Sequence, residues 1–350
     1  MNNKRFWHVL AALILVALAA CSPAAPAAET SAPLETGVSV TMAPATTEAV
    51  SATSAPATTE AVSVTSSPSA GGTAMPTAGT GAQVTQALPG TGSSAASLPE
   101  VAIDAADFTF KMEQTVPAGW VQVTLTNSGV EPHHVQLMRL NTNVTYEQFQ
   151  AALAQGEGPA LALVEAVGGV GPIVPGGLGQ VAINLPEGEY VVICFIPSPG
   201  DNIPHFAKGM VQRITVSAAQ GTAAAEPQAD LSITMRDYGF DIPTSLSSGP
   251  LAVKVTNEGP EWHELNIYRL AEGKTMADVV AFQSGTAEPG TPPPFIPVGG
   301  INGLSPNLYG YMLLNLEPGN YVAICNIPSA QNQGKPHFML GMVREFTVAP

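Results

Sequence analysis

The chain has 350 residues and a formal net charge of -15, with 12 Lys and Arg against 27 Asp and Glu. That balance leaves no basic patch for nucleic acid. The length would suit two ordinary domains, but only 11% of the residues are charged and the composition is uneven, so the folded part is shorter than the chain.

The first twenty residues have the layout of a secretory signal. Lys4 and Arg5 precede an apolar run from Phe6 to Ala20, which is too short for a transmembrane helix. The run ends in Leu18-Ala-Ala-Cys21, which resembles the lipobox of bacterial lipoproteins. The resemblance implies a signal peptide over residues 1–20, a lipid on Cys21, and a cell-membrane lipoprotein facing the periplasm or the cell exterior. An ordinary signal peptide with an incidental cysteine is the alternative.

Residues 21–98 are rich in Ala, Thr, Ser and Pro and nearly free of aromatic side chains. The segment Ala-Pro-Ala-Thr-Thr-Glu-Ala-Val-Ser occurs at 43–51 and again at 55–63, which is typical of low complexity. Such a composition cannot bury enough apolar surface to offset the entropy of ordering. We therefore predict a disordered tether that holds the folded part away from the membrane.

The remainder is a tandem repeat, predicted as one domain over 99–218, a linker over 219–229 and a second domain over 230–350. Each repeat opens with an Asp-aromatic pair, followed by a strand of alternating apolar residues that ends in an Asn-x-Gly turn. The matching segments are Asp107-Phe108 and Asp237-Tyr238, 121–126 and 251–256, and Asn127-Ser-Gly129 and Asn257-Glu-Gly259.

Later segments also correspond between the repeats and predict mainly β domains, each a sandwich with one short helical insertion. Strands are predicted at 135–140 and 265–270, helices at 146–153 and 276–282, and final strands at 211–216 and 343–348. Two Gly- and Pro-rich runs, 167–179 and 285–303, are predicted to form ordered but irregular loops.

A thiol, an imidazole and a thioether recur in fixed order near the end of each repeat, with a second imidazole upstream. In the first repeat these are His133, Cys194, His205 and Met210; in the second they are His263, Cys325, His337 and Met342. Cys194 and Cys325 occupy equivalent positions, so a disulfide would have to join the same pole of both domains, and metal binding is the preferred explanation. Two imidazoles, one thiolate and a weak thioether suit a blue-copper centre.

The pattern Asn-x-Gly-x-x-x-His, Gly-x-Tyr-x-x-x-Cys and His-x-x-x-Gly-Met resembles the cupredoxins, the plastocyanin and azurin family of blue-copper proteins. The resemblance covers both repeats nearly end to end. It implies two Greek-key β-sandwiches with one copper ion each, held by the eight residues named above. His134 also follows the first turn, but Glu264 stands at its place in the second repeat, so the register favours His133.

The interval from cysteine to histidine departs from the family pattern. It is eleven residues from Cys194 to His205 and twelve from Cys325 to His337, against only a few in typical members. Proline, serine, glycine and asparagine within it predict an excursion that turns and returns. A more open site, another axial ligand and no metal at all are the alternatives that a longer loop leaves.

The function predicted from these features is electron transfer by an exported, membrane-anchored copper protein with a redox partner protein. Copper storage or delivery, and a metal-free cupredoxin-like binding or scaffold module, are the alternatives. An oxidase or reductase needs extra histidines for catalytic copper. Of the six histidines one is His8 in the signal, and two copper sites leave only His134. The sequence therefore predicts that the chain is not an enzyme.

Overall fold

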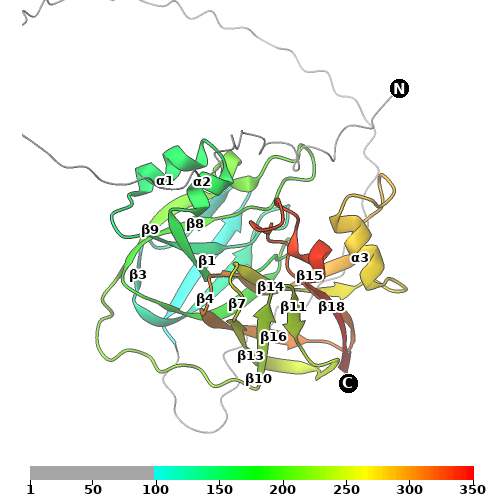
Figure 1. The fold of residues 1–350 in the computed structure, drawn as a ribbon. Coiled ribbons are helices and arrows are strands. Elements are labelled where there is room, and N and C mark those ends of the chain that lie inside the picture. The colour runs from blue at the N-terminus through cyan, green and yellow to red at the C-terminus, as the bar shows by residue number, and fades with distance from the viewer. Residues whose placement is uncertain (1–97) are drawn as a thin grey trace, which may run out of the picture. The chain divides into compact units, whose positions relative to one another are not determined.

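The structure, a computed structural model, describes residues 98–350 (Figure 1). The predicted signal peptide, the lipidated Cys21 and the tether up to residue 97 lie outside the described residues. Among the residues that are described, no helix is long and apolar enough to cross a membrane.

The first repeat forms two β-sheets with an apolar core between them. In the first sheet the order is β7-β4-β1-β2, and in the second it is β6-β5-β8-β9-β3. β1 runs parallel to β4, and β3 runs parallel to β9; the other pairs are antiparallel. The strands are β1 (Glu100–Ala106), β2 (Thr109–Lys111), β3 (Thr115–Pro117), β4 (Gly119–Asn127), β5 (Gln136–Leu140), β6 (Val164–Gly168), β7 (Leu178–Leu185), β8 (Gly188–Ile193) and β9 (Val211–Ser217).

The second repeat has the same arrangement, which confirms the predicted fold class of two cupredoxin-like β-sandwiches. Its sheets run β11-β10-β13-β16 and β12-β18-β17-β14-β15. The strands are β10 (Leu231–Arg236), β11 (Gly239–Asp241), β12 (Ser245–Ser247), β13 (Gly249–Asn257), β14 (His263–Leu270), β15 (Phe295–Leu304), β16 (Tyr309–Leu316), β17 (Gly319–Ile324) and β18 (Val343–Ala349).

The strand that leads to each cysteine is buried on both faces, and its alternation decides where the thiol points. Tyr190, Val192 and Cys194 belong to the core between the sheets, whereas Val191 and Ile193 belong to a smaller cluster outside it. Successive side chains of a strand point to opposite faces. The thiol therefore continues the inner face of β8 at the point where the chain leaves the sheet.

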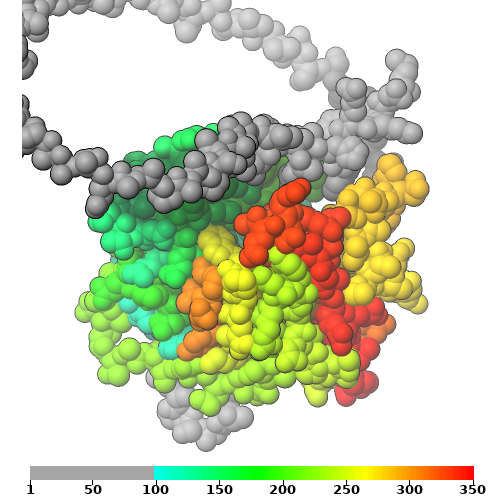
Figure 2. Space-filling model, in the orientation of Figure 1, coloured from blue at the N-terminus to red at the C-terminus, as the bar shows by residue number. Residues whose placement is uncertain are grey.

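Helices cover the outer face of that sheet. The predicted helix is confirmed as α1 (Tyr146–Leu153), with Thr145 in a capping box with Gln148, and its Phe149 packs in the cluster outside the core. A second helix, α2 (Glu157–Leu161), was not predicted. Figure 1 shows both helices beside β8 and β9. In the second repeat α3 (Met276–Gln283) confirms its prediction and lies at the surface, in yellow-orange in Figure 2.

The prediction of irregular loops in the Gly- and Pro-rich runs was wrong in part. β15 takes up the second half of the 285–303 run and pairs with β14. Gly300 shows why glycine permits this pairing: a Cβ there would lie 2.3 Å from the Leu265 carbonyl oxygen. The glycines allow a close approach of two backbones, which composition alone cannot distinguish from a loop.

Both sheets continue from one repeat into the other. β7 pairs with β16 through Val181 and Met312, and β6 meets β15 at Val167 and Leu304. The buried Asn302 side chain donates to the carbonyl oxygens of Val135 and Val170 of the first repeat, at 2.9 and 3.2 Å. The two repeats thus share backbone pairing and one apolar core.

Candidate metal centres

Three of the predicted ligands of the first repeat converge. His133 follows the Asn-x-Gly turn after β4, Cys194 follows β8, and His205 opens the short helix η1 (His205–Lys208). The two Nδ1 atoms lie 3.0 Å apart, and Cys194 Sγ lies 3.5 Å from His205 Nδ1. All three side chains are fully buried. The donor atoms lie within 4.8 Å of one another.

The second repeat reproduces this group. His263 opens β14, Cys325 follows β17, and His337 opens the short helix η2 (His337–Leu340). The Nδ1 atoms of the two histidines are 3.0 Å apart, and Cys325 Sγ is 3.4 Å from His337 Nδ1. These three side chains are also fully buried. The structure therefore contains two equivalent His-Cys-His groups.

The long interval between cysteine and histidine is closed at its neck. Pro197 and Pro204 form an isolated β-bridge, and the Ser198 N–H donates to the Ile203 carbonyl oxygen at 3.0 Å. The loop of the second repeat closes in the same way between Pro328 and Pro336. The extra residues extend beyond the neck, so they do not separate thiol from imidazole.

The backbone brings each methionine next to the other ligands. The Cys194 N–H donates to the Met210 carbonyl oxygen at 3.1 Å, and the Met210 N–H donates to the His205 carbonyl oxygen at 3.0 Å. Met342 makes the same two bonds in the second repeat. Gly209 precedes Met210 with φ 125°, a conformation that L side chains rarely adopt. Both methionines are buried, and their role as axial ligands stays a prediction.

Carboxylates hold the outer nitrogens of the first repeat's histidines. His133 Nε2 is 2.7 Å from Asp107 Oδ1, and His205 Nε2 is 2.9 Å from Glu131 Oε2. Because an ionised carboxylate only accepts hydrogen bonds, this arrangement places a proton on each Nε2 and leaves Nδ1 as the nitrogen that can bind a metal ion. Both Nδ1 lone pairs then face each other and the cysteine sulfur.

The second repeat has the same carboxylates with one difference. His263 Nε2 is 2.5 Å from Asp237 Oδ1. His337 Nε2 lies 3.3 Å from Glu261 Oε2, without the geometry of a hydrogen bond. Glu261 instead accepts from the Tyr238 hydroxyl at 2.7 Å and from the Gln331 N–H at 3.1 Å, which ties it to the cysteine-to-histidine loop.

The Asn-x-Gly turn supports the histidine that follows it. The Asn127 side chain donates to the carbonyl oxygens of Glu131 and Ile173 and accepts from the Gly129 N–H, all at 2.9 Å. A Cβ on Gly129 would lie 2.4 Å from Asp107 Oδ1 and 2.7 Å from His133 Nε2. Glycine is required here because the His–Asp pair packs directly against its backbone.

Burial controls the protonation of the groups. It raises the pKa of the Cys194 thiol to about 12 and the pKa of Cys325 well above its usual value. Burial also lowers the pKa of His205, against the effect of the hydrogen bond that it donates to Glu131, and lowers the pKa of His337 to about 4. His205 and His337 are therefore neutral at pH 7, and a metal ion would have to displace the thiol proton.

The donor set fits a soft, thiophilic metal ion. Two imidazole nitrogens and one sulfur converge in a buried space, and a cation between them would interact favourably with all three. His₂Cys with a distant thioether is the donor set of blue copper, for which thiolate and imidazole are suitable ligands. The eight predicted ligands would hold two such ions, and bound copper would supply a one-electron couple.

His134 is buried beside the first group without joining it. Its Nε2 accepts a hydrogen bond from the Phe195 N–H at 2.8 Å. Burial, with smaller contributions from His205 and His133, lowers the pKa of His134 to about 3. The structure thus places His134 behind the cysteine and not among the converging donors.

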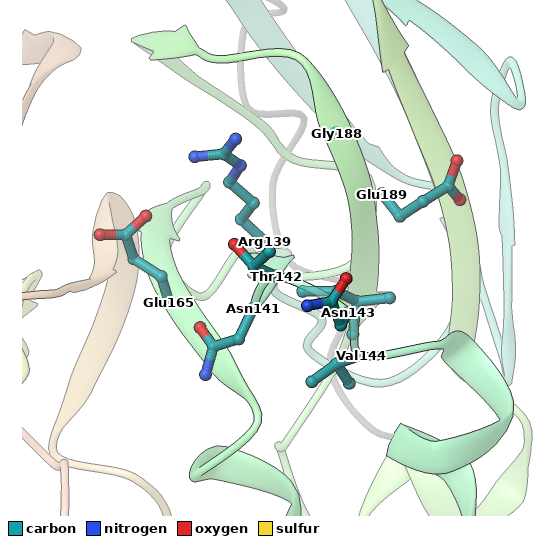
Figure 3. Close-up of a pocket in the computed structure, with 9 residues that line it drawn as sticks. Arg139, Asn141, Thr142, Asn143, Val144, Glu165, Gly188 and Glu189 are labelled. Carbon is teal, nitrogen blue, oxygen red and sulfur yellow. The ribbon is translucent and has the colours of Figure 1, made fainter.

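One surface hollow lies away from both groups. It has a volume of about 440 Å³ and is lined by polar residues that include Arg139, Asn141, Glu165 and Glu189 (Figure 3). The Arg139 guanidinium donates to the Glu187 carbonyl oxygen at 2.9 Å. None of the eight predicted ligands lines this hollow, so it is not part of either group.

The four carboxylates were missed as functional residues by sequence reasoning. Asp107 and Asp237 served only to mark the start of each repeat, and no sequence pattern singled out Glu131 and Glu261. The available signal was their recurrence at equivalent positions, two in each repeat. Their function depends on which histidine nitrogen they face, which spacing does not reveal.

Comparisons with known proteins give structural likeness only. No family model matches the chain, and no curated protein matches it. A reduced auracyanin from the photosynthetic bacterium Roseiflexus castenholzii is 23% identical, with 34% of this chain and 96% of that chain covered and a TM-score of 0.24. A blue copper oxidase from Nitrosomonas europaea is 14% identical, with 71% and 85% covered and a TM-score of 0.22.

One of these comparisons corrects an expectation. A copper-containing nitrite reductase from Thermus scotoductus matches 72% of this chain and 62% of its own, at 12% identity and a TM-score of 0.20. With the oxidase, it contradicts the prediction that the chain is not an enzyme. The histidine count was a weak exclusion, because carboxylates and a second chain can also supply metal ligands. What the structure itself shows is a pair of cupredoxin-like domains, each with a buried His-Cys-His group.

Proposed function

We propose that the chain binds one copper ion in each repeat and carries electrons between partner proteins. The observation that carries the proposal is the convergence of two Nδ1 atoms and one sulfur in both repeats. Storage of copper would not require this burial, since an ion meant for release needs access to an acceptor. A buried, pre-organised group instead suits a metal that stays in place while its charge changes.

The proposed location is the outer face of a cell membrane, with the lipid on Cys21 as the anchor. The charged start, the apolar run and Leu18-Ala-Ala-Cys21 support it. Palmitate labelling of the chain in cells, lost in Cys21→Ala, tests this anchor. Equal labelling of the variant would contradict it.

Cycling of the metal between two oxidation states tests electron transfer. The copper-loaded chain is reduced and reoxidised repeatedly in the presence of a copper chelator, and both metal content and absorption are followed. We expect the absorption to return in full with the copper retained. Progressive loss of copper to the chelator in the reduced state would contradict electron transfer and favour copper delivery.

A further inference from the structure

The two centres differ in the residue that stands behind the cysteine. His134 and Glu264 each follow the first histidine of their repeat, and both side chains are almost fully buried. Each accepts a hydrogen bond from the N–H of the residue after the cysteine: His134 Nε2 from Phe195 at 2.8 Å, and Glu264 Oε1 from Asn326 at 2.9 Å. The same structural position therefore holds an imidazole in one repeat and a carboxyl in the other.

The neighbours of His134 also differ from the neighbours of Glu264. His134 meets the edge of the Phe195 ring, with the ring centroids 6.2 Å apart. In the second repeat an amide, Asn326, stands at the place of Phe195, and the side chains of Asn326 and Asn266 donate to Glu264 Oε1 at 3.1 and 2.8 Å. With the Asn326 N–H, this oxygen receives three N–H donors. Such a set of donors is suited to an ionised carboxylate.

The protonation of the neighbours agrees with this difference. Because His134 accepts at Nε2 from a backbone N–H, its ring is neutral. Glu264 Oε1 is buried and accepts from three N–H groups, a hydrogen-bond pattern that favours the ionised form of a carboxyl group. The Glu264 N–H lies 3.5 Å from Cys325 Sγ, which places this residue against the sulfur.

Other charges near the two groups do not offset this one. Asp107 and Glu131 of the first repeat have counterparts in Asp237 and Glu261, so the carboxylates around the histidines are balanced. Lys208 lies near the first group but is paired with Asp201 at 2.9 Å. Lys335 precedes His337 by two residues and is exposed, so solvent screens its charge. The buried Glu264 is the remaining difference in charge.

We propose that Glu264 gives the copper centre of the second repeat the lower reduction potential, so that an electron shared by the two centres rests on the first. The inference depends on the proposed copper binding. Oxidation adds one positive charge to a His₂Cys copper centre, and a nearby buried carboxylate stabilises that charge. In the exchange the second centre goes from Cu(I) to Cu(II) and the first from Cu(II) to Cu(I); no proton or bond is transferred.

A potentiometric titration of the copper-loaded full chain, followed by visible absorption, tests the inference. We expect two one-electron steps, with the first centre reduced in roughly tenfold or greater excess over the second at half-reduction. Cys325→Ser should remove the lower step, which assigns it to the second repeat. A single step for both centres, or loss of the upper step in Cys325→Ser, would overturn the inference.

Substitution of Glu264 tests the cause. Glu264→Gln keeps an oxygen that can accept from Asn326 but removes the charge, and we expect it to raise the lower step and leave the upper step unchanged. The matched control is Glu288→Gln, an exposed carboxylate of the same repeat, which should shift neither step. An unchanged lower step in Glu264→Gln would overturn the inference.

Substitutions in the first repeat provide a test that does not depend on the folding of Glu264→Gln. His134→Glu with Phe195→Asn transfers the second arrangement to the first repeat, and we expect the upper step to fall toward the lower one. An upper step that stays in place or rises would count against Glu264 as the cause. A full chain that takes up no copper would instead overturn the proposed function, whereas two copper centres of equal potential would overturn only this inference.

Discussion

At the scale of single residues, the carboxylate behind each histidine decides which nitrogen faces the cysteine. Asp107 illustrates this: burial opposes its ionisation, but hydrogen bonds from the Val130 N–H and His133 outweigh burial and lower the pKa of Asp107. The ionised group then holds the Nε2 proton of His133. Outer partners of this kind orient the ligands of protein metal sites and increase their donor strength.

Removal of this carboxylate should weaken one centre. In Asp107→Ala the Nε2 proton of His133 loses its acceptor and the ring can rotate, so copper affinity at the first centre should fall about 10- to 100-fold. Competition with a chelator on the loaded full chain measures this as the early loss of one copper of two. Asp241→Ala, which removes an exposed aspartate, is the control. Equal retention of both ions in Asp107→Ala would contradict the assigned role.

The buried His134 should make the stability of the copper-free chain depend on pH. Its pKa is about 3 when folded and near 6.5 when unfolded, so below pH 6.5 the unfolded chain binds a proton that the folded chain does not. This group's contribution should therefore lower the free energy of unfolding by about 3 kcal/mol between pH 7.5 and 4.5. His134→Gln should lose that part of the pH dependence in urea denaturation. An equally steep fall in the variant would refute the assignment.

The eight candidate ligands could be predicted from the sequence, whereas the roles of the neighbouring carboxylates could not. Thiol, imidazole and thioether are rare side chains, and their repetition in fixed order makes them visible. Carboxylates are common on surfaces, so Asp107 and Glu131 were not distinguished from solvated residues. The burial of His134 and its bond to Phe195 depend on two strands that are far apart in the sequence.

At the scale of elements, the neck between Pro197 and Pro204 fixes the histidine regardless of the residues beyond it. The Ser198 N–H closes this neck onto the Ile203 carbonyl oxygen. His205 N–H then donates to the Ile196 carbonyl oxygen at 2.9 Å, which seats the ligand at the end of β8. Loop length alone does not predict the distance between thiol and imidazole, because it counts residues that lie beyond the closure.

Shortening the loop beyond the neck should preserve the first centre. Residues 199–202 can be replaced by Asn-Gly, since a two-residue turn spans strand ends that are already paired. We expect copper affinity within about threefold of the parent chain, because loop closure changes free energy slowly with length. Ser198→Pro, which removes the N–H at the neck, should weaken binding more. If the shortened chain loses copper while Ser198→Pro retains it, the neck is not what positions His205.

Local sequence patterns predict some elements of the fold and miss others. The helix at 146–153 was predicted because apolar residues recur at helical spacing, and Thr145 caps it as the pattern implies. β15 was missed because its glycines resemble a loop. Gly300 is required by the nearby Leu265 backbone, a contact set by the sheet and not by neighbouring residues in the sequence.

At the scale of the whole molecule, the described residues form two repeats with matching contacts on each side. The Gly171 N–H donates to the Gly300 carbonyl oxygen, and the Asn302 N–H donates to that of Gly169; these bonds are equivalent under exchange of the repeats. A contact with this property is isologous, as in a twofold dimer. The repeats should therefore hold together without the covalent linker.

Cleavage of the linker tests this association. A protease site placed between Gln220 and Ala224 in the full chain would separate the repeats covalently, and we expect the two fragments to elute together in size-exclusion chromatography. Asn302→Asp in the cut chain places a carboxylate against the carbonyl oxygens of Val135 and Val170 and should weaken the association. Separate elution of the fragments without this substitution would show that the linker, and not the interface, joins the repeats.

The copper content and visible absorption of the purified full chain test the central claim most directly. The chain is loaded with Cu(II), freed of excess metal and compared with Cys194→Ser, Cys325→Ser and the double variant. We predict two copper ions per chain and an intense thiolate-to-copper absorption that falls by about half in each single variant and disappears in the double variant. A colourless, copper-free chain after loading would contradict the claim.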